Sequence, residues 1–232
     1  MEAQTNSTSE YLAATALCDC DNPWLRGLAA EITQGAETPT EKAMRVFEYV
    51  RDHVRFGLAF SRSKASQTLK RGYGECGTKT NAQVALLRAI GIPARFRRVR
   101  AKSEVLHGLI LEFVYKQIPP TASHFWAECY LDGRWVSCEA LLDRPLYEGM
   151  LRAGLLTKAQ IPTIDWDGHS DLVLLGPWIT EDLGHLPGYD EALAALIRNK
   201  EDIPPLWFER LIAPWFYPLN LRPSDRLRRL AR

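Results

Sequence analysis

Three residues of this chain have the types and the spacing of a cysteine-based nucleophilic site, and the first of them is Cys76. It lies in the glycine-rich segment 72–77, which leads into a helical pattern that ends at Gly91. Because glycine lets the backbone turn sharply, we expect this segment to deliver Cys76 to the first turn of an amphipathic helix. Unpaired amides and the positive end of the helix dipole there favour thiolate over thiol. The pattern predicts a reactive thiol, and the alternative is a buried cysteine that packs as a small hydrophobe.

A thiol nucleophile needs an imidazole to take its proton and a third group to orient that imidazole. His124 begins a predicted strand, and Asp132-Gly133 predicts a two-residue type I′ turn into the next strand. In that register Trp126 faces Glu139, so His124 and Glu139 are diagonal neighbours on one face of the sheet. Glu128 shares the face but lies beyond Trp126. We therefore predict His124 as the base and Glu139 as its orienting acid.

Local patterns predict the elements that position these residues. Asn22-Pro23 and the capping box 38–41 predict two helix starts before Cys76. Strands are predicted at 94–100, 107–115, 123–131 and 134–139, and helices at 143–156 and 190–198. Helices followed by antiparallel strands predict an α+β fold. We expect one domain over 1–232, with a core at about 38–142 and a helical, irregular C-terminal extension at about 143–232.

The overall composition narrows the functional classes. A net charge of +1 gives no global field that favours nucleic acid or an acidic membrane as a partner. The N-terminus lacks the basic and apolar regions of a signal peptide, and no apolar run reaches the length of a membrane span. We therefore expect a cytoplasmic protein with reduced thiols and no membrane partner.

The five cysteines lack the paired spacing of zinc ligands, and Cys18-Asp19-Cys20 is too tight for a zinc knuckle. A zinc hydrolase that uses Cys76, His124 and Cys129 is an alternative, but Cys129 faces the opposite side of its strand from His124. No metal and no other cofactor is predicted. Cys129 and Cys138 are predicted core residues, and a disulfide between them stays open.

A run of arginines follows the helix that begins at Cys76: Arg95, Arg97, Arg98 and Arg100. Its alternative interpretations are a solvated strand edge and a site for an anionic substrate or the phosphate of a carrier, because Arg recognises such groups well.

Three blocks in this order resemble the transglutaminase-like superfamily: 72–77, 88–95 and 124–136. The resemblance covers Val46 to Leu142. It implies a papain-like α+β fold, of the small bacterial type, and a Cys-His-Asp triad whose first two members are Cys76 and His124. The third position holds Glu139 where the family usually has Asp, which keeps the charge and adds a methylene.

This resemblance implies a cysteine-dependent acyl-transfer enzyme that works through a thioester on Cys76. Water as the acceptor would make it a peptidase or amidase, and an amine would make it an amide-forming acyltransferase. The expected partners are a peptide, amide or acyl-thioester substrate and an acyl carrier. Protein cross-linking is disfavoured because no calcium loop is evident and the chain is too short for further β domains. The alternative from another class is a non-catalytic binding protein that keeps the fold. The oligomeric state is not predicted.

Overall fold

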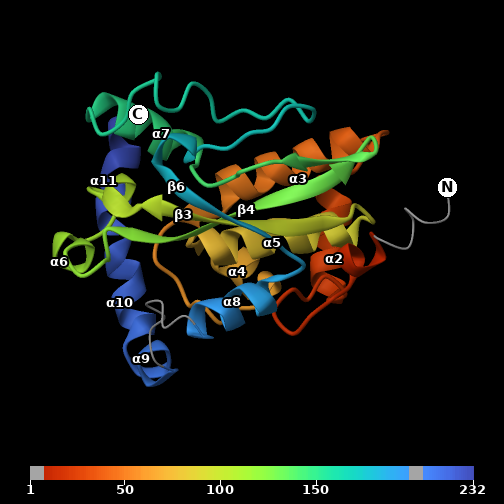
Figure 1. The fold of residues 1–232 in the computed structure, drawn as a ribbon, viewed down its shortest axis with the longest axis horizontal. Coiled ribbons are helices and arrows are strands. Elements are labelled where there is room, and N and C mark those ends of the chain that lie inside the picture. The colour runs from red at the N-terminus through yellow and green to blue at the C-terminus, as the bar shows by residue number, and fades with distance from the viewer. Residues whose placement is uncertain (1–7, 199–205) are drawn as a thin grey trace.

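The computed structural model describes residues 8–198 and 206–232 and has the predicted α+β fold (Figure 1). An antiparallel four-stranded sheet has the order β5-β4-β3-β6. Its strands are β3 (Ala94–Lys102), β4 (Thr121–Leu131), β5 (Arg134–Ser137) and β6 (Ile179–Leu186). Two short parallel strands, β1 (Arg55–Phe56) and β2 (Tyr73–Gly74), pair immediately before Cys76.

The helices that precede the sheet begin where their capping residues predict. Asn22 accepts hydrogen bonds from the first amides of α2 (Pro23–Ile32), and Thr38 and Glu41 form the capping box of α3 (Pro39–His53). A short helix, α4 (Ala65–Arg71), leads to β2, and α5 (Cys76–Ala89) follows. The predicted helix at Cys76 is thus confirmed.

The prediction that α5 is amphipathic is wrong, because every residue from Gly77 to Arg88 is buried. Helices α2, α3 and α4 pack on α5 while β4 covers another side of it. An all-buried helix has no polar face to show in its sequence, and the polar residues that α5 does carry therefore need partners inside the protein.

The predicted hairpin register is confirmed. Asp132 (φ 49°) and Gly133 (φ 83°) both have the positive φ that a type I′ turn needs. Leu131 pairs with Arg134, and the ladder continues to the pair Glu128 and Ser137. There β5 ends, two residues before Glu139; Cys138 still donates its amide to the Ala127 carbonyl at 2.9 Å and also forms a parallel bridge with Leu172.

Two predictions about strands differ from the structure. Residues 107–115 do not form a strand; the 3-10 helix η2 (Ser103–Leu106) and the short helix α6 (Glu112–Tyr115) occupy this region, and Gly108 between them has φ 77°. On the side away from β4, β3 pairs with β6, a strand that the sequence did not predict. It is an edge strand whose residues are all exposed or half-buried, so it lacks an alternation of buried apolar and exposed polar residues.

The remaining elements are 3-10 helices η1 (Ser9–Leu12) and η3 (Gly176–Trp178) and helices α7 (Arg144–Arg152), α8 (Tyr189–Arg198), α9 (Leu206–Leu211), α10 (Ala213–Asn220) and α11 (Arg222–Leu230). In Figure 1, α9, α10 and α11 run along one side of the molecule. Helix α11 packs on α7, and its Arg228 donates hydrogen bonds to the buried Asp143. The C-terminal helices are thereby tied to the segment that follows Glu139.

None of the helices in the described part of the chain combines the length and the apolarity needed to cross a bilayer.

Candidate active site

His124 and Glu139 form a buried pair. The distance between His124 Nε2 and Glu139 Oε1 is 2.8 Å, and the two residues are 5% and 1% exposed. A carboxylate only accepts hydrogen bonds, so Nε2 carries the hydrogen that is donated to Glu139. This leaves Nδ1 as the ring nitrogen that can accept a proton.

Two backbone amides hold the other oxygen of Glu139. Leu174 N donates to Oε2 at 2.5 Å and Leu175 N donates at 3.3 Å. The side chain therefore spans from His124 to the segment before η3, a distance for which the additional methylene of glutamate is suited. No local pattern in the sequence indicates these two amides, since any residue except proline supplies one.

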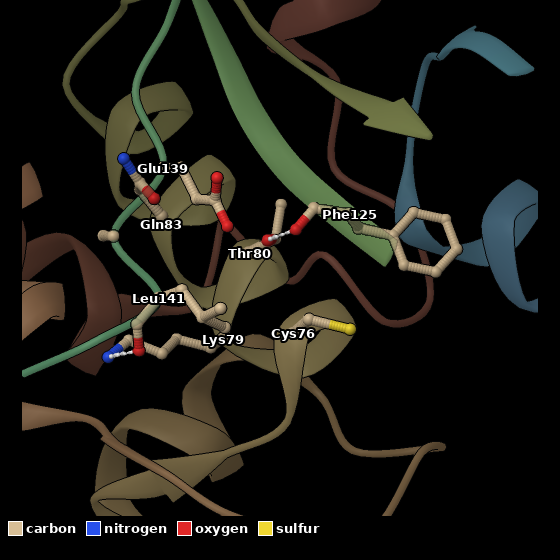
Figure 2. A pocket seen from close by; sticks show the side chains of 8 residues that line it. Cys76, Lys79, Thr80, Gln83, Phe125, Glu139 and Leu141 are labelled. Carbon is tan, nitrogen blue, oxygen red and sulfur yellow. Dashed lines mark hydrogen bonds between the residues drawn. The ribbon is translucent and has the colours of Figure 1, made fainter. Parts of the chain in front are cut away.

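Cys76 is the first residue of α5 and lines the same small cavity as Glu139. Its thiol donates a hydrogen bond to Glu75 Oε2 at 3.4 Å, and among the described residues it makes none to His124. Figure 2 shows the sulfur directed away from the Glu139 carboxylate. The structure thus joins His124 to Glu139 directly and brings Cys76 to the cavity that Glu139 lines, with its thiol turned to Glu75.

Burial and the negative charge of Glu75 raise the pKa of the Cys76 thiol well above its ordinary value. The amides of Phe125 and Gly77 oppose this rise without cancelling it. The expectation that the helix start favours a thiolate is therefore wrong for this resting arrangement. The reasons are the burial of the thiol and the carboxylate of Glu75, which caps the amides whose partial positive charge was expected to act on the sulfur.

Polar side chains of α5 hold the two segments that carry His124 and Glu139. Thr80 Oγ1 donates to the carbonyl of Phe125 at 3.2 Å, one residue after His124. Gln83 Nε2 donates to the carbonyl of Cys138 at 2.9 Å, one residue before Glu139. The same helix that presents Cys76 therefore also fixes the backbone that carries His124 and Glu139.

Lys79, which sequence reasoning missed, lines the cavity one helical turn after Cys76. It is 2% exposed, and Nζ donates to the carbonyls of Arg51 and Leu141 at 3.1 and 3.0 Å; the bond to Leu141 is drawn in Figure 2. Burial lowers the pKa of Lys79 to about 7. A lysine inside an otherwise buried helix was the available signal, because a buried lysine needs polar partners.

Two arginines of the run form ion pairs with acidic residues of the neighbouring strands. Arg95 donates to Glu128 at 2.6 Å and Arg97 forms ion pairs with Glu128 and Asp182. Because β3 lies between β4 and β6, the strand-edge interpretation is wrong. Arg95 and Arg97 each pair with a carboxylate, which gives no support to an anion site on β3. The same ion pairs give Glu128 a partner other than His124.

The thiols of Cys129 and Cys138 are free and fully buried, 3.8 Å apart, so both are core residues as predicted. Within residues 8–198 and 206–232, no group of three His, Cys, Asp or Glu side chains has the arrangement of a metal site.

A helix that begins at a cysteine and packs on an antiparallel sheet is the arrangement of papain-like folds. Residues 26–140 match the family model of the transglutaminase-like superfamily. Residues 26–140, just under half of the chain, therefore belong to that superfamily. No curated protein matches the sequence significantly.

Two solved structures are similar to this chain. One, described as a "putative cysteine protease" from Cytophaga hutchinsonii, has a TM-score of 0.53 and 18% identity over 80% of this chain and 49% of its own. The other, described as a "putative protease" from Parabacteroides distasonis, has a TM-score of 0.37 and 12% identity over 53% of this chain and 25% of its own. The chain thus spans about half the length of the first structure, and that likeness shows the fold.

Proposed function

We propose that this protein is a cysteine-dependent acyl-transfer enzyme whose nucleophile is Cys76, whose base is His124 and whose orienting acid is Glu139. The observation that carries the proposal is the buried hydrogen bond between His124 and Glu139 at the cavity that Cys76 lines. A buried imidazole with one nitrogen bound to a carboxylate and the other left for a proton is the arrangement that activates a thiol.

In the first half of the reaction, the Cys76 thiol turns from Glu75 and gives its proton to His124 Nδ1. The sulfur attacks the carbonyl carbon of an amide or thioester, a C–S bond forms, and the bond to the leaving group breaks. His124 passes its proton to the leaving amine or thiol. The Cys76 amide is the natural donor to the oxyanion, since Glu75 occupies the Gly77 and Thr78 amides.

In the second half, His124 Nδ1 takes a proton from the acceptor, which attacks the thioester, and the proton returns to the sulfur as the C–S bond breaks. Glu139 keeps its hydrogen bond with Nε2 throughout and stabilises the imidazolium. Water as the acceptor gives a peptidase or amidase, and an amine gives an acyltransferase. The described activity of the Cytophaga hutchinsonii protein supports peptide or amide substrates for this one.

The test is covalent trapping. The protein is incubated with a panel of short-chain acyl thioesters of N-acetylcysteamine and with peptide amides, and adducts are mapped by mass spectrometry. We expect an acyl adduct on Cys76 that forms in the wild type and forms about 100-fold to 10,000-fold more slowly in His124→Ala. A non-catalytic binding protein would give no adduct with any member of the panel.

The other four cysteines provide the internal control, because all of them are buried in the protein: Cys18, Cys20, Cys129 and Cys138. Background acylation of these thiols should be slow and independent of His124. Acylation of Cys76 no faster than theirs, or at the same rate with and without His124, would sink the proposal.

A further inference from the structure

Glu75, the residue before the nucleophile, makes an unusual set of contacts. Its Oε2 accepts the Gly77 amide at 2.6 Å and lies 3.4 Å from Cys76 Sγ, and its Oε1 accepts the Thr78 amide at 2.8 Å. One carboxylate therefore caps the nucleophile's helix and holds the nucleophile's hydrogen. A cap needs only an oxygen acceptor, and Ser, Thr, Asp or Asn are the usual residues. The longer, charged side chain of Glu75 instead reaches the thiol.

Helix α8, which lies outside the residues that match the superfamily, also restrains the Glu75 carboxylate. The Tyr189 hydroxyl of α8 lies 3.2 Å from Glu75 Oε1 and 2.8 Å from the Ser61 carbonyl oxygen, and Tyr189 is 2% exposed. A Cβ added at Gly77 would come within 2.8 Å of the Tyr189 ring. Gly77 thus provides the space that lets Tyr189 approach the helix start and restrain Glu75.

We propose that Glu75 is a positioning residue that keeps Cys76 in a protonated resting orientation, with the thiol hydrogen held by the carboxylate until His124 removes it. The resting enzyme then carries a neutral thiol, and the thiolate forms only when the sulfur turns from Glu75 toward the imidazole. The catalytic consequence rests on the function proposed above, whereas the effect of Glu75 on the thiol does not.

The charge of Glu75 has the sign and the position for this role. A negative charge in contact with the sulfur disfavours the thiolate, and it also offsets the helix-end amides that would stabilise it. Three other charged groups lie nearby. Arg71 of α4 interacts with Glu75 electrostatically without a direct ion pair, Lys79 of α5 is turned to Leu141, and Glu139 lines the same cavity as Cys76. His124 of β4 is the base that receives the proton.

The experiment measures the titration of the Cys76 thiol itself. The rate of alkylation by iodoacetamide is followed at Cys76 by peptide mass spectrometry between pH 5 and pH 10 in the wild type and in Glu75→Gln. The amide keeps an acceptor for the helix cap and removes the charge. We expect the midpoint to fall by at least about 1 pH unit, so that alkylation below the midpoint is about tenfold faster.

Two further variants keep the test decisive. Glu75→Asp retains the charge and a favoured cap but withdraws the carboxylate from the sulfur, so its midpoint should lie between those of the wild type and Glu75→Gln. Glu41→Gln makes the same carboxylate-to-amide change at the capping box of α3, away from Cys76, and should leave the midpoint unchanged.

A midpoint in Glu75→Gln that equals or exceeds that of the wild type would overturn the role of Glu75, and so would an equal fall in Glu41→Gln. Because alkylation needs no substrate, these outcomes are separate from failure of the proposed function, which is read from the acyl adduct.

Discussion

Replacing Glu139 with the family's usual aspartate should impair this protein, because the surroundings of the carboxylate are built for glutamate. Glu139 bridges His124 Nε2 on one oxygen and the amides of Leu174 and Leu175 on the other. Aspartate is shorter by one methylene, about 1.5 Å. If its carboxylate stays on the two amides, the distance to Nε2 grows from 2.8 Å to roughly 4.3 Å, beyond the range of a hydrogen bond.

The loss of one charge-assisted hydrogen bond in a buried site is worth about 1.5–3 kcal/mol. If the missing hydrogen bond destabilises the imidazolium that forms in the reaction, the rate of adduct formation should drop about tenfold to a hundredfold. If the carboxylate instead follows His124, the Leu174 and Leu175 amides lose their acceptor, and the loss appears in the free energy of unfolding. The sum of the two effects should exceed about 1.5 kcal/mol in either case.

The assay combines acyl-adduct formation on Cys76 with urea unfolding of Glu139→Asp. Glu128→Asp is the matched control, since Glu128 lies on the same strand face and pairs with Arg95 rather than His124. Its rate of adduct formation should stay close to that of the wild type. An aspartate variant as fast and as stable as the wild type would refute the reasoning, because the anchoring by the Leu174 and Leu175 amides would then be irrelevant.

Three further predictions concern the elements around the site. Arg228→Ala removes the cation that pairs with the buried Asp143, so the free energy of unfolding in urea should fall by about 3–5 kcal/mol. If residues 1–232 form the predicted single domain, the unfolding should be one cooperative transition; two separate transitions would contradict it. Burial lowers the pKa of Lys79 to about 7, so between about pH 7 and pH 10.5 the unfolded chain binds the Lys79 proton more tightly than the folded protein does. The free energy of unfolding of the wild type, relative to that of Lys79→Met, should therefore rise as the pH rises through this window. A stability difference between the two proteins that is the same at pH 6 and pH 9 would contradict this. Gly133→Ala places a side chain at φ 83° and should cost about 1–2 kcal/mol in urea unfolding, with Gly133→Asn costing less; equal stability of Gly133→Ala and the wild type would contradict it.

The features that the sequence predicted correctly are those with short-range causes. Capping residues start α2 and α3 because a side chain satisfies amides two or three positions away. Asp132-Gly133 fixes the hairpin because a two-residue turn allows one register, and alternation of side chains then puts His124 and Glu139 on one face. The errors arose where partners are distant. Strand β6 pairs with β3 across some 80 residues, so no local pattern revealed it, and residues 107–115, predicted as a strand, do not form one.

The sequence by itself determined which residues are available for chemistry: a cysteine at a helix start, a histidine on a strand, and an acid in register with it. Only the tertiary structure decided the state of each. Burial and the charge of Glu75 raise the pKa of the Cys76 thiol, although the helix end alone predicted the opposite, and two remote amides orient Glu139 toward His124. Residue type and spacing are local properties, whereas burial, charge and hydrogen-bond partners depend on segments that meet only when the chain folds.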